Sequence, residues 1–350
     1  MESIWFQDEA FFSIINFLEN TDISCTYEYE APAALHVDGF VGESMTAAGP
    51  SPYSGDILES PELVWCEDTW SEEREREARN IIQKKHRAAN TFWKEKFEKE
   101  AKKNWDLFYK SHATNFYKDR HYLAVVFPEL SPDARDLRVG AQEMQGLHIP
   151  RSKRKTLLEL GCGVGNSVFP LLEENPGIFV YAYDFSDVAI RLLCQDPVYP
   201  YYEHRCSAKV FDATSGEIPK EILSNGGLDL CLLQFCLSAI SPENFQKVAS
   251  IVFSLLKPGG KLLLRDYGRY DEAQLRFGKN SLIENNFYAR GDGTRSYFFT
   301  SQELKHIFCH EQGFIELENS YIRRQYANRA QQKARHRIWV HAKFQKPFNT

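Results

Sequence analysis

Short apolar runs recur along the second half of this chain, and helix-like stretches separate them. Five runs have the length of buried strands: Leu157–Leu160, Ile178–Asp184, Cys206–Phe211, Leu228–Phe235 and Lys261–Tyr267. The intervening stretches 167–174 and 242–256 have the apolar spacing of helices. This alternation predicts an α/β fold with a mostly parallel sheet and helices on its faces.

Turn and capping signals mark the ends of these elements. Lys257-Pro-Gly-Gly260 predicts a turn after the helix at 242–256, and Thr300-Ser-Gln-Glu303 is a capping box that opens another helix. Two late apolar stretches, near 315–326 and 337–344, predict an antiparallel hairpin at the end of the chain.

The first part of the chain has a different composition. Residues 1–22 contain one apolar helix-like piece, and 40–62 are rich in Gly, Ser and Pro, which predicts a flexible connector. From Ser71 to about Tyr109 the composition is strongly helical. We therefore expect three parts: an acidic, partly flexible extension (1–70), a helical segment (71–150) and an α/β domain (151–350).

Charge is divided unevenly between these parts. The 350 residues carry a net charge of −6, but residues 1–77 hold 18 acidic and 2 basic residues, whereas the remainder holds 30 acidic and 40 basic ones. A basic body suits a polyanionic partner, although an ordinary solvated surface explains the charge equally well.

Several classes of protein fit the sequence poorly. It has no run of 18 apolar residues and no basic, apolar leader, so we expect no membrane span and no secretory signal. The eight cysteines are scattered without a C-x-x-C pair, so we expect reduced thiols, no metal and a cytoplasmic location, with nuclear or mitochondrial pools left open.

One glycine turn carries the clearest chemical signal. The run Lys155–Leu160 ends in Gly161, Gly163 and Gly165, and a helix-like stretch follows at once. Glycine permits a sharp turn and the close approach of a ligand. A dinucleotide site has a related pattern but needs a small residue at Asn166. With Glu159 before the turn, the spacing instead resembles motif I of S-adenosylmethionine (SAM) methyltransferases; a turn without any ligand is the remaining alternative.

The end of the next apolar run adds an acid. Asp184 lies about 20 residues beyond the glycines, where a carboxylate accepts hydrogen bonds from ribose hydroxyls in folds of this class. A solvated carboxylate at a strand end is the alternative.

Aromatic and basic residues are interleaved before the α/β domain. Trp105, Phe108 and Tyr109 share one helix face by their spacing, and the segment 115–122 adds Phe116, Tyr117, Lys118, Arg120 and His121. Such a mixture suits single-stranded nucleic acid, where bases stack and phosphates pair with cations. We expect Phe108 to pack on the core, and core packing is the alternative for Trp105 and Tyr109.

Long motifs resemble one enzyme family. The segments 103–109, 115–121, 159–166, 265–271 and 284–300 are similar, in this order, to the tRNA N3-methylcytidine methyltransferases. The resemblance covers about residues 90–347 and leaves out the acidic extension. The ending Lys343-Phe-Gln-Lys-Pro347 is similar to the branch that acts on threonine tRNAs, with serine and arginine tRNAs as alternatives.

The resemblance implies a fold and a cofactor site. It implies a Rossmann-like class I methyltransferase with a seven-stranded, mostly parallel sheet, an antiparallel last strand and a helical lid that binds tRNA. SAM is then the cofactor and S-adenosylhomocysteine (SAH) the product. The implied cofactor-binding residues are Trp105, Tyr109, Glu159, Gly161, Gly163, Gly165, Asp184, Asp212, Ala213 and Gln234.

It also implies a reaction at cytidine 32 of the anticodon loop. Cytosine N3 must be unpaired before it can be methylated, and the product base is cationic. Asp266, expected to accept from the exocyclic amine, and Tyr267 are the candidate catalytic residues at a strand end. Expected tRNA contacts are Phe116, Tyr117, Lys118, Arg120, His121, Arg265, Tyr288, Arg290, Arg295, Tyr297, Arg323 and Arg324.

Two points stay open in the sequence. Arg265 points opposite to Asp266 by strand alternation, so a structural ion pair is as good an interpretation, and Gly291-Asp-Gly293 equally fits a plain hairpin turn. Two alternatives to tRNA methylation also remain: the protein is a SAM-dependent methyltransferase that acts on a protein or a small molecule, or it is a non-catalytic binding module with this fold. A protein partner, such as an aminoacyl-tRNA synthetase or another tRNA-binding protein, is also compatible.

Overall fold

A computed structural model describes residues 57–59, 65–84, 89–113, 119–329 and 332–349. By contact the chain forms two compact units, 1–71 with 323–337 and 72–322 with 338–350. This grouping has no boundary at residue 150, so the expected division there into a helical segment and an α/β domain stays a prediction about the function of the two segments. None of the described helices is long and apolar enough to cross a membrane.

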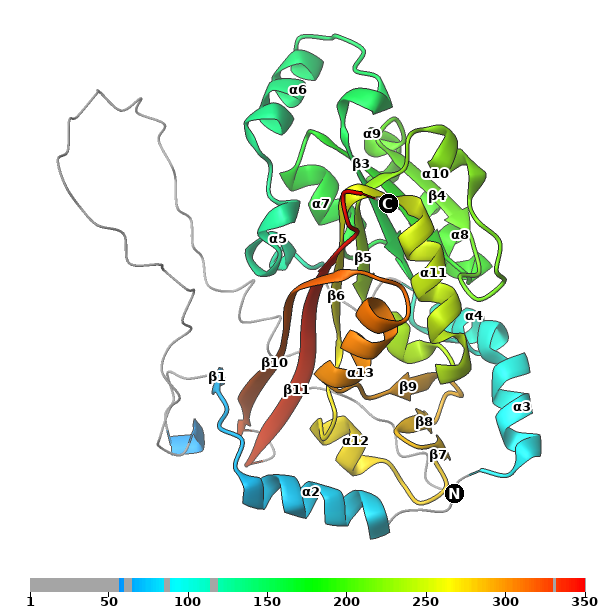
Figure 1. Ribbon diagram of the computed structural model, residues 1–350, viewed down its shortest axis with the longest axis vertical. Coiled ribbons are helices and arrows are strands. Elements are labelled where there is room, and N and C mark those ends of the chain that lie inside the picture. Colours follow the sequence, from blue (N-terminus) through cyan, green and yellow to red (C-terminus); the bar gives the residue numbers. More distant parts are fainter. Residues whose placement is uncertain (1–56, 60–64, 85–88, 114–118, 330–331, 350) are drawn as a thin grey trace, which may run out of the picture. The chain divides into compact units, whose positions relative to one another are not determined.

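The larger unit is built on a sheet with the strand order β10-β11-β6-β5-β2-β3-β4 (Figure 1). Strands β2 to β6 pair in parallel, and β11 runs antiparallel to β6, which confirms the predicted sheet. The strands are β2 (Lys155–Leu160), β3 (Ile178–Asp184), β4 (Cys206–Val210), β5 (Leu228–Gln234), β6 (Leu256–Tyr267), β10 (Ile315–Asn328) and β11 (Lys333–Gln345).

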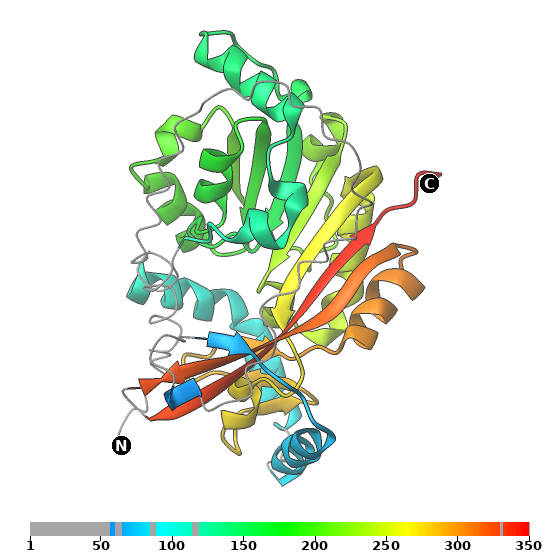
Figure 2. The ribbon, with the colours of Figure 1, turned by 90° about the vertical axis from the view of Figure 1, so that its left-hand side faces the viewer.

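Alternate side chains of these strands enter two apolar cores, one on each face of the sheet. Figure 2 shows β11 (red) between β6 (yellow) and β10 (orange). The helices are α2 (Glu72–Lys84), α3 (Thr91–Lys99), α4 (Ala101–His112), α5 (Leu123–Val126), α6 (Ala134–Met144), α7 (Val168–Glu174), α8 (Asp187–Gln195), α9 (Tyr199–Tyr202), α10 (Lys220–Ser224), α11 (Phe245–Leu255), α12 (Glu272–Arg276) and α13 (Ser301–Lys305). In β2, Leu157 packs on one face with α7 and α8, while Leu158 and Leu160 pack on the other with α11.

One local prediction is confirmed and another needs correction. The stretch 71–109, expected to be helical, contains α2, α3 and α4 among its described residues. The Asn90 side chain accepts from the Trp93 amide and starts α3, and Glu100 separates α3 from α4. The predicted turn at Lys257–Gly260 lies inside β6. Leu256 pairs with Leu228 and Lys261 with Leu230, so the intervening residues form a bulge.

A second, small sheet follows β6. It consists of β7 (Leu282–Glu284), β8 (Phe287–Ala289) and β9 (Arg295–Tyr297), all antiparallel. Gly291-Asp-Gly293 forms the hairpin turn between β8 and β9, where the Arg290 amide donates to the Thr294 carbonyl over 2.7 Å. The capping box of Thr300 and Glu303 opens α13 as predicted.

The smaller unit holds the strand β1 (Trp65–Glu67), which the sequence did not predict. β1 pairs antiparallel with the last part of β10, so that Trp65 faces Tyr326 and Glu67 faces Arg324. Arg324 donates to the Glu67 carboxylate over 3.3 Å, and the His336 ring lies 3.0 Å from the Asp68 carboxylate.

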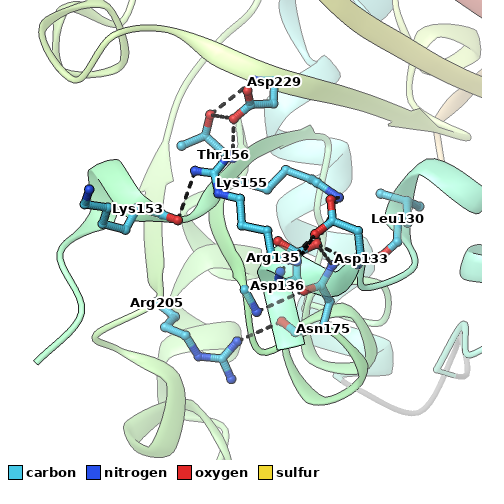
Figure 3. A network of polar contacts seen from close by, with 11 residues as sticks. Leu130, Asp133, Arg135, Asp136, Lys153, Lys155, Thr156, Asn175, Arg205 and Asp229 are labelled. Carbon is cyan, nitrogen blue, oxygen red and sulfur yellow. Dashed lines mark hydrogen bonds and ion pairs between the residues drawn. The ribbon is translucent and has the colours of Figure 1, made fainter. Parts of the chain in front are cut away.

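A polar network joins α6 to the amino-terminal edge of the large sheet (Figure 3). Asp136 of α6 is buried, and its carboxylate accepts from the Lys155 ammonium over 2.9 Å and from the Asn175 amide over 3.3 Å. Thr156, the next residue of β2, donates to Asp229 of the adjacent strand β5 and ties the two strands together. The network fixes the start of β2, the strand that leads into the glycine turn.

We predict that Asp136→Ala destabilises the larger unit. Removing one partner of a buried ion pair costs about 3 kcal/mol, which corresponds to roughly 6–12 °C of melting temperature for a domain of this size. Lys153→Ala is the matched control, because that side chain is exposed beside the same network. Equal melting temperatures for the two variants would contradict a stabilising role of Asp136.

Candidate functional site

The glycine turn lies between β2 and α7 at the carboxyl edge of the parallel strands. All three glycines have positive φ, with +72° at Gly161, +57° at Gly163 and +97° at Gly165. A Cβ at Gly163 would lie 2.8 Å from the Tyr109 hydroxyl oxygen, so a side chain here would displace the aromatic ring that covers the turn. The turn is thus shaped by the contact with α4 as well as by its own backbone.

Two buried carboxylates flank this turn. Asp184 accepts from the amides of Gly163 and Ser186, both over 2.9 Å, and its burial raises the pKa to about 6. Burial raises the pKa of Glu159 to about 7, although the charge of Arg120 and a hydrogen bond from Ser167 act in the opposite direction. Within the described residues, Glu159 Oε2 has no hydrogen-bond partner.

The other predicted cofactor residues lie at the ends of neighbouring strands. Gln234 ends β5 and is buried; its Nε2 donates to the Tyr122 hydroxyl over 3.0 Å, and Oε1 lacks a partner among the described residues. Ala213 is buried after β4, whereas Asp212 is exposed and accepts from the Thr214 amide over 2.8 Å.

Helix α4 covers the turn with aromatic side chains. The rings of Trp105 and Tyr109 are stacked with centroids 5.8 Å apart, and Tyr109 and Phe108 pack with Val164 of the turn and Val188 of α8. Trp105 is half-buried, so one of its faces is partly open. This arrangement matches a lid over a ligand held at the turn.

The residues present fit SAM better than a dinucleotide. The Gly163 amide already donates to Asp184, so it does not offer a free donor to a pyrophosphate, and the nearby carboxylates disfavour an anion. SAM carries a cationic sulfonium, an ammonium group and ribose hydroxyls. These would supply the donors and the positive charge that the unpartnered oxygens of Glu159 and Gln234 lack. Among the described residues there is no group of side chains that could hold a metal ion.

The candidate catalytic strand end is packed differently from expectation. Asp266 has no exposed surface, and its oxygens accept from the amides of Ser238 over 2.9 Å and Tyr267 over 2.8 Å. The expected direct contact between Asp266 and a base stays a prediction. Burial raises the pKa of Asp266 to about 6. Tyr267 is half-buried and accepts at its hydroxyl from Arg290 over 3.3 Å.

A residue that sequence reasoning missed stands beside Tyr267. Phe235 directly follows Gln234 and has φ of +53°, a left-handed conformation that is strained for a side chain of this size. Its ring centroid lies 5.0 Å from that of Tyr267, and the Arg120 guanidinium is 5.8 Å from it. Its position directly after Gln234, a predicted cofactor residue, was the available signal in the sequence, whereas the strain of its backbone is visible only in the structure.

Arginine and aromatic side chains alternate along this edge. The Arg265 guanidinium lies 5.0 Å from the Trp339 ring and 5.7 Å from the Tyr122 ring, and Arg290 lies 5.7 Å from the Tyr267 ring. Arg120 also donates from its backbone to the Asn166 carbonyl over 2.8 Å, which places it against the glycine turn. The structure thus brings three predicted tRNA-contacting arginines to the carboxyl edge of the sheet.

Three other residues expected to contact tRNA have buried side chains, so their contact with RNA stays a prediction. Tyr288 stacks on Phe277 with centroids 4.7 Å apart, Arg295 is paired with Glu98, and the Tyr297 hydroxyl donates to Glu303 over 3.0 Å. These partners hold the small sheet together and leave little surface for RNA.

The remaining expected contacts lie elsewhere. His121 is exposed and pairs with Glu174 over 2.9 Å. In the smaller unit, Arg323 lies 5.8 Å from the Trp70 ring, and Arg324 lies 5.0 Å from the Trp65 ring. Phe116, Tyr117 and Lys118 lie outside the described residues.

Comparison with known proteins identifies close relatives. A family model described as a methyltransferase domain matches residues 134–318. A Danio rerio protein named tRNA N(3)-cytidine methyltransferase METTL2 is 43% identical over 90% of this chain and 98% of the relative. The METTL2 protein of Xenopus tropicalis is 40% identical over 86% and 96%, and human tRNA N(3)-cytidine methyltransferase METTL6 is 41% identical over 73% and 84%.

We predict that Glu159→Gln stabilises the ligand-free chain but weakens cofactor binding. The folded state keeps the Glu159 proton up to a pKa of about 7, whereas the unfolded chain loses it near its ordinary value of 4.5. Stability therefore falls as pH rises between these values, by roughly 3 kcal/mol once both states are ionised. Glu159→Gln has no proton to lose at this position, so its free energy of unfolding does not fall in this way. Its melting temperature should therefore exceed that of the wild type at pH 8 and match it near pH 4.5.

Thermal melts at both pH values and SAH calorimetry check this prediction. Glu173→Gln is the control, since it removes an exposed carboxylate from α7. A Gln variant that binds SAH with wild-type affinity would show that Glu159 is a core residue and not part of the cofactor site.

Proposed function

The chain belongs to the family of tRNA N(3)-cytidine methyltransferases, and from this premise we propose that it methylates N3 of cytidine 32 in the anticodon loop of threonine tRNAs. It is a SAM-dependent enzyme of this family. The observation that carries the proposal is the row of arginine and aromatic side chains beside the cofactor turn, at the edge where α/β folds bind their substrates.

The threonine branch is supported by one further observation. The ending Lys343-Phe-Gln-Lys-Pro347 resembles the threonine-tRNA branch of the family. In this proposal, cytidine 32 and threonine tRNA are inferred from the sequence resemblance, whereas the mechanism of methyl transfer is inferred from the residues at the site.

The chemistry requires an accessible cytosine and a place for a cationic product. Bound SAM supplies an electrophilic methyl group, and the chain's residues orient the base and exclude water. Phe235 and Tyr267 offer aromatic faces on which an unstacked cytosine can lie. The same faces favour the positive charge that the base gains. Arg120, Arg265 and Arg290 are suited to the phosphates on either side of that base.

In this proposal Asp266 acts through its neighbours. Its oxygens hold the Ser238 and Tyr267 amides, which sets the backbone on both sides of the base-binding aromatics. Its charge also lies one residue from Tyr267, where it can offset positive charge on the base. Asp266 is therefore proposed as a positioning residue, while Tyr267 and Phe235 contact the substrate.

Methyl transfer to purified transcripts tests the proposed function. Threonine tRNAs should gain N3-methylcytidine, detected by nucleoside analysis, and a transcript with cytidine 32 replaced by uridine should gain none. Serine and arginine tRNAs serve as comparison substrates, and an aminoacyl-tRNA synthetase is added to test for a required partner. Methylation of serine tRNAs alone would contradict the threonine assignment, and methylation of the uridine-32 transcript would contradict the position.

We predict that Phe235→Ala lowers the rate of methyl transfer to tRNA. Stacking of one base on an aromatic ring is worth about 1–3 kcal/mol, which is roughly 5- to 150-fold in kcat/KM for tRNA. Phe235→Tyr keeps the ring and is the matched control. Single-turnover rates and SAH calorimetry separate the two sites, because SAH affinity should change little. An unchanged rate in the Ala variant would remove Phe235 from the substrate site.

A further inference from the structure

Helix α4 is joined to the cofactor edge by a polar contact that none of the roles above uses. Asp106 lies on α4 between Trp105 and the core residues Phe108 and Tyr109. Its Oδ1 accepts from the Ser186 hydroxyl over 2.5 Å and lies 3.4 Å from the Val188 amide. Asp106 thereby meets the first turn of α8, where a carboxylate is favoured by the free amides and the helix dipole.

The partner of this contact belongs to the loop that holds Asp184. The Ser186 amide donates to Asp184 over 2.9 Å, and the Ser186 hydroxyl caps α8 by accepting from the Ala189 amide over 3.1 Å. Ser186 is fully buried. A displacement of Asp106 is therefore transmitted to the carboxylate that flanks the glycine turn.

Other contacts fix the opposite side of α4. Asn104, two residues before Asp106, donates to the Gly293 carbonyl over 2.9 Å, in the hairpin turn of the small sheet. The exposed pair of Lys102 and Asp187, at 2.6 Å, adds little because both charges remain in water. Apart from the aromatic packing, Asp106 thus makes the main polar connection from α4 to α8.

We propose that Asp106 is a positioning residue for the cofactor. By holding α4 against Ser186 and the first turn of α8, it keeps Trp105 and Tyr109 over the glycine turn and slows the release of SAM. This role rests on the proposed binding of SAM at the glycine turn and does not depend on which tRNA is the substrate. Asp106 adds to the aromatic packing and the Asn104 contact that also hold α4 in place.

Two variants at this position distinguish geometry from charge. Asp106→Ala removes the acceptor and should weaken SAH binding about 10- to 100-fold, mainly through faster dissociation. Asp106→Asn keeps an oxygen at the Oδ1 position without the charge, so it should stay within about threefold of the wild type. Lys103→Ala is the control, because this exposed residue on the same helix makes only a loose pair with Glu100 at 3.9 Å.

Calorimetry and stopped-flow dissociation of SAH give the affinities and rates, and amide hydrogen exchange follows residues 101–112. Exchange in this helix should rise in the Ala variant and stay near wild type in the Asn variant. Wild-type SAH affinity in Asp106→Ala, even with a lower melting temperature, would overturn the proposal and leave Asp106 a purely structural residue. Equal losses in the Ala and Asn variants would also overturn it, since charge rather than position would then set the affinity.

Discussion

The structure depends on carboxylates that are buried at the carboxyl edge of the sheet before any ligand is present. Glu159 ends up beneath the glycine turn with an oxygen that lacks a partner among the described residues, and burial raises its pKa to about 7. Asp184 is buried beside it, with a pKa raised to about 6. Such groups lower the stability of the free chain, so their presence is explained by a ligand that brings donors and positive charge.

The rest of the larger unit supports this edge from several directions. The network at the opposite end of the sheet fixes the start of β2, and the two apolar cores hold β2 between β3 and β5. Helix α4 closes over the turn, while Phe235 and Tyr267 present aromatic faces next to it. In the proposed site, cofactor and substrate are held by adjacent strand ends, so that a methyl group passes between them without a covalent enzyme intermediate.

The order of strands and helices and the position of the glycine turn were predicted well from local sequence. Strand length, glycine spacing and the acid at the end of β3 can each be recognised within a short segment. The burial of Tyr288, Arg295 and Tyr297 was not predicted. Arg295 pairs with Glu98, which is distant in sequence, whereas Tyr288 and Tyr297 contact Phe277 and Glu303 of neighbouring elements. The bulge at Lys257–Gly260 shows the same limit: a turn signal cannot reveal that the strand resumes its pairing. Phe235 and Asp106 were missed because backbone strain and contacts between helices are visible only in three dimensions.

Proton release on cofactor binding tests the central claim most directly. Donors and positive charge from the ligand should lower the pKa of Glu159 and Asp184, so SAM should displace protons between about pH 6 and 7. Calorimetry in buffers of different ionisation enthalpy measures the number of protons released for each SAM molecule bound. We expect net proton release near pH 6.5 in the wild type and a smaller release in Glu159→Gln. Proton uptake, or an equal release by the variant, would contradict it.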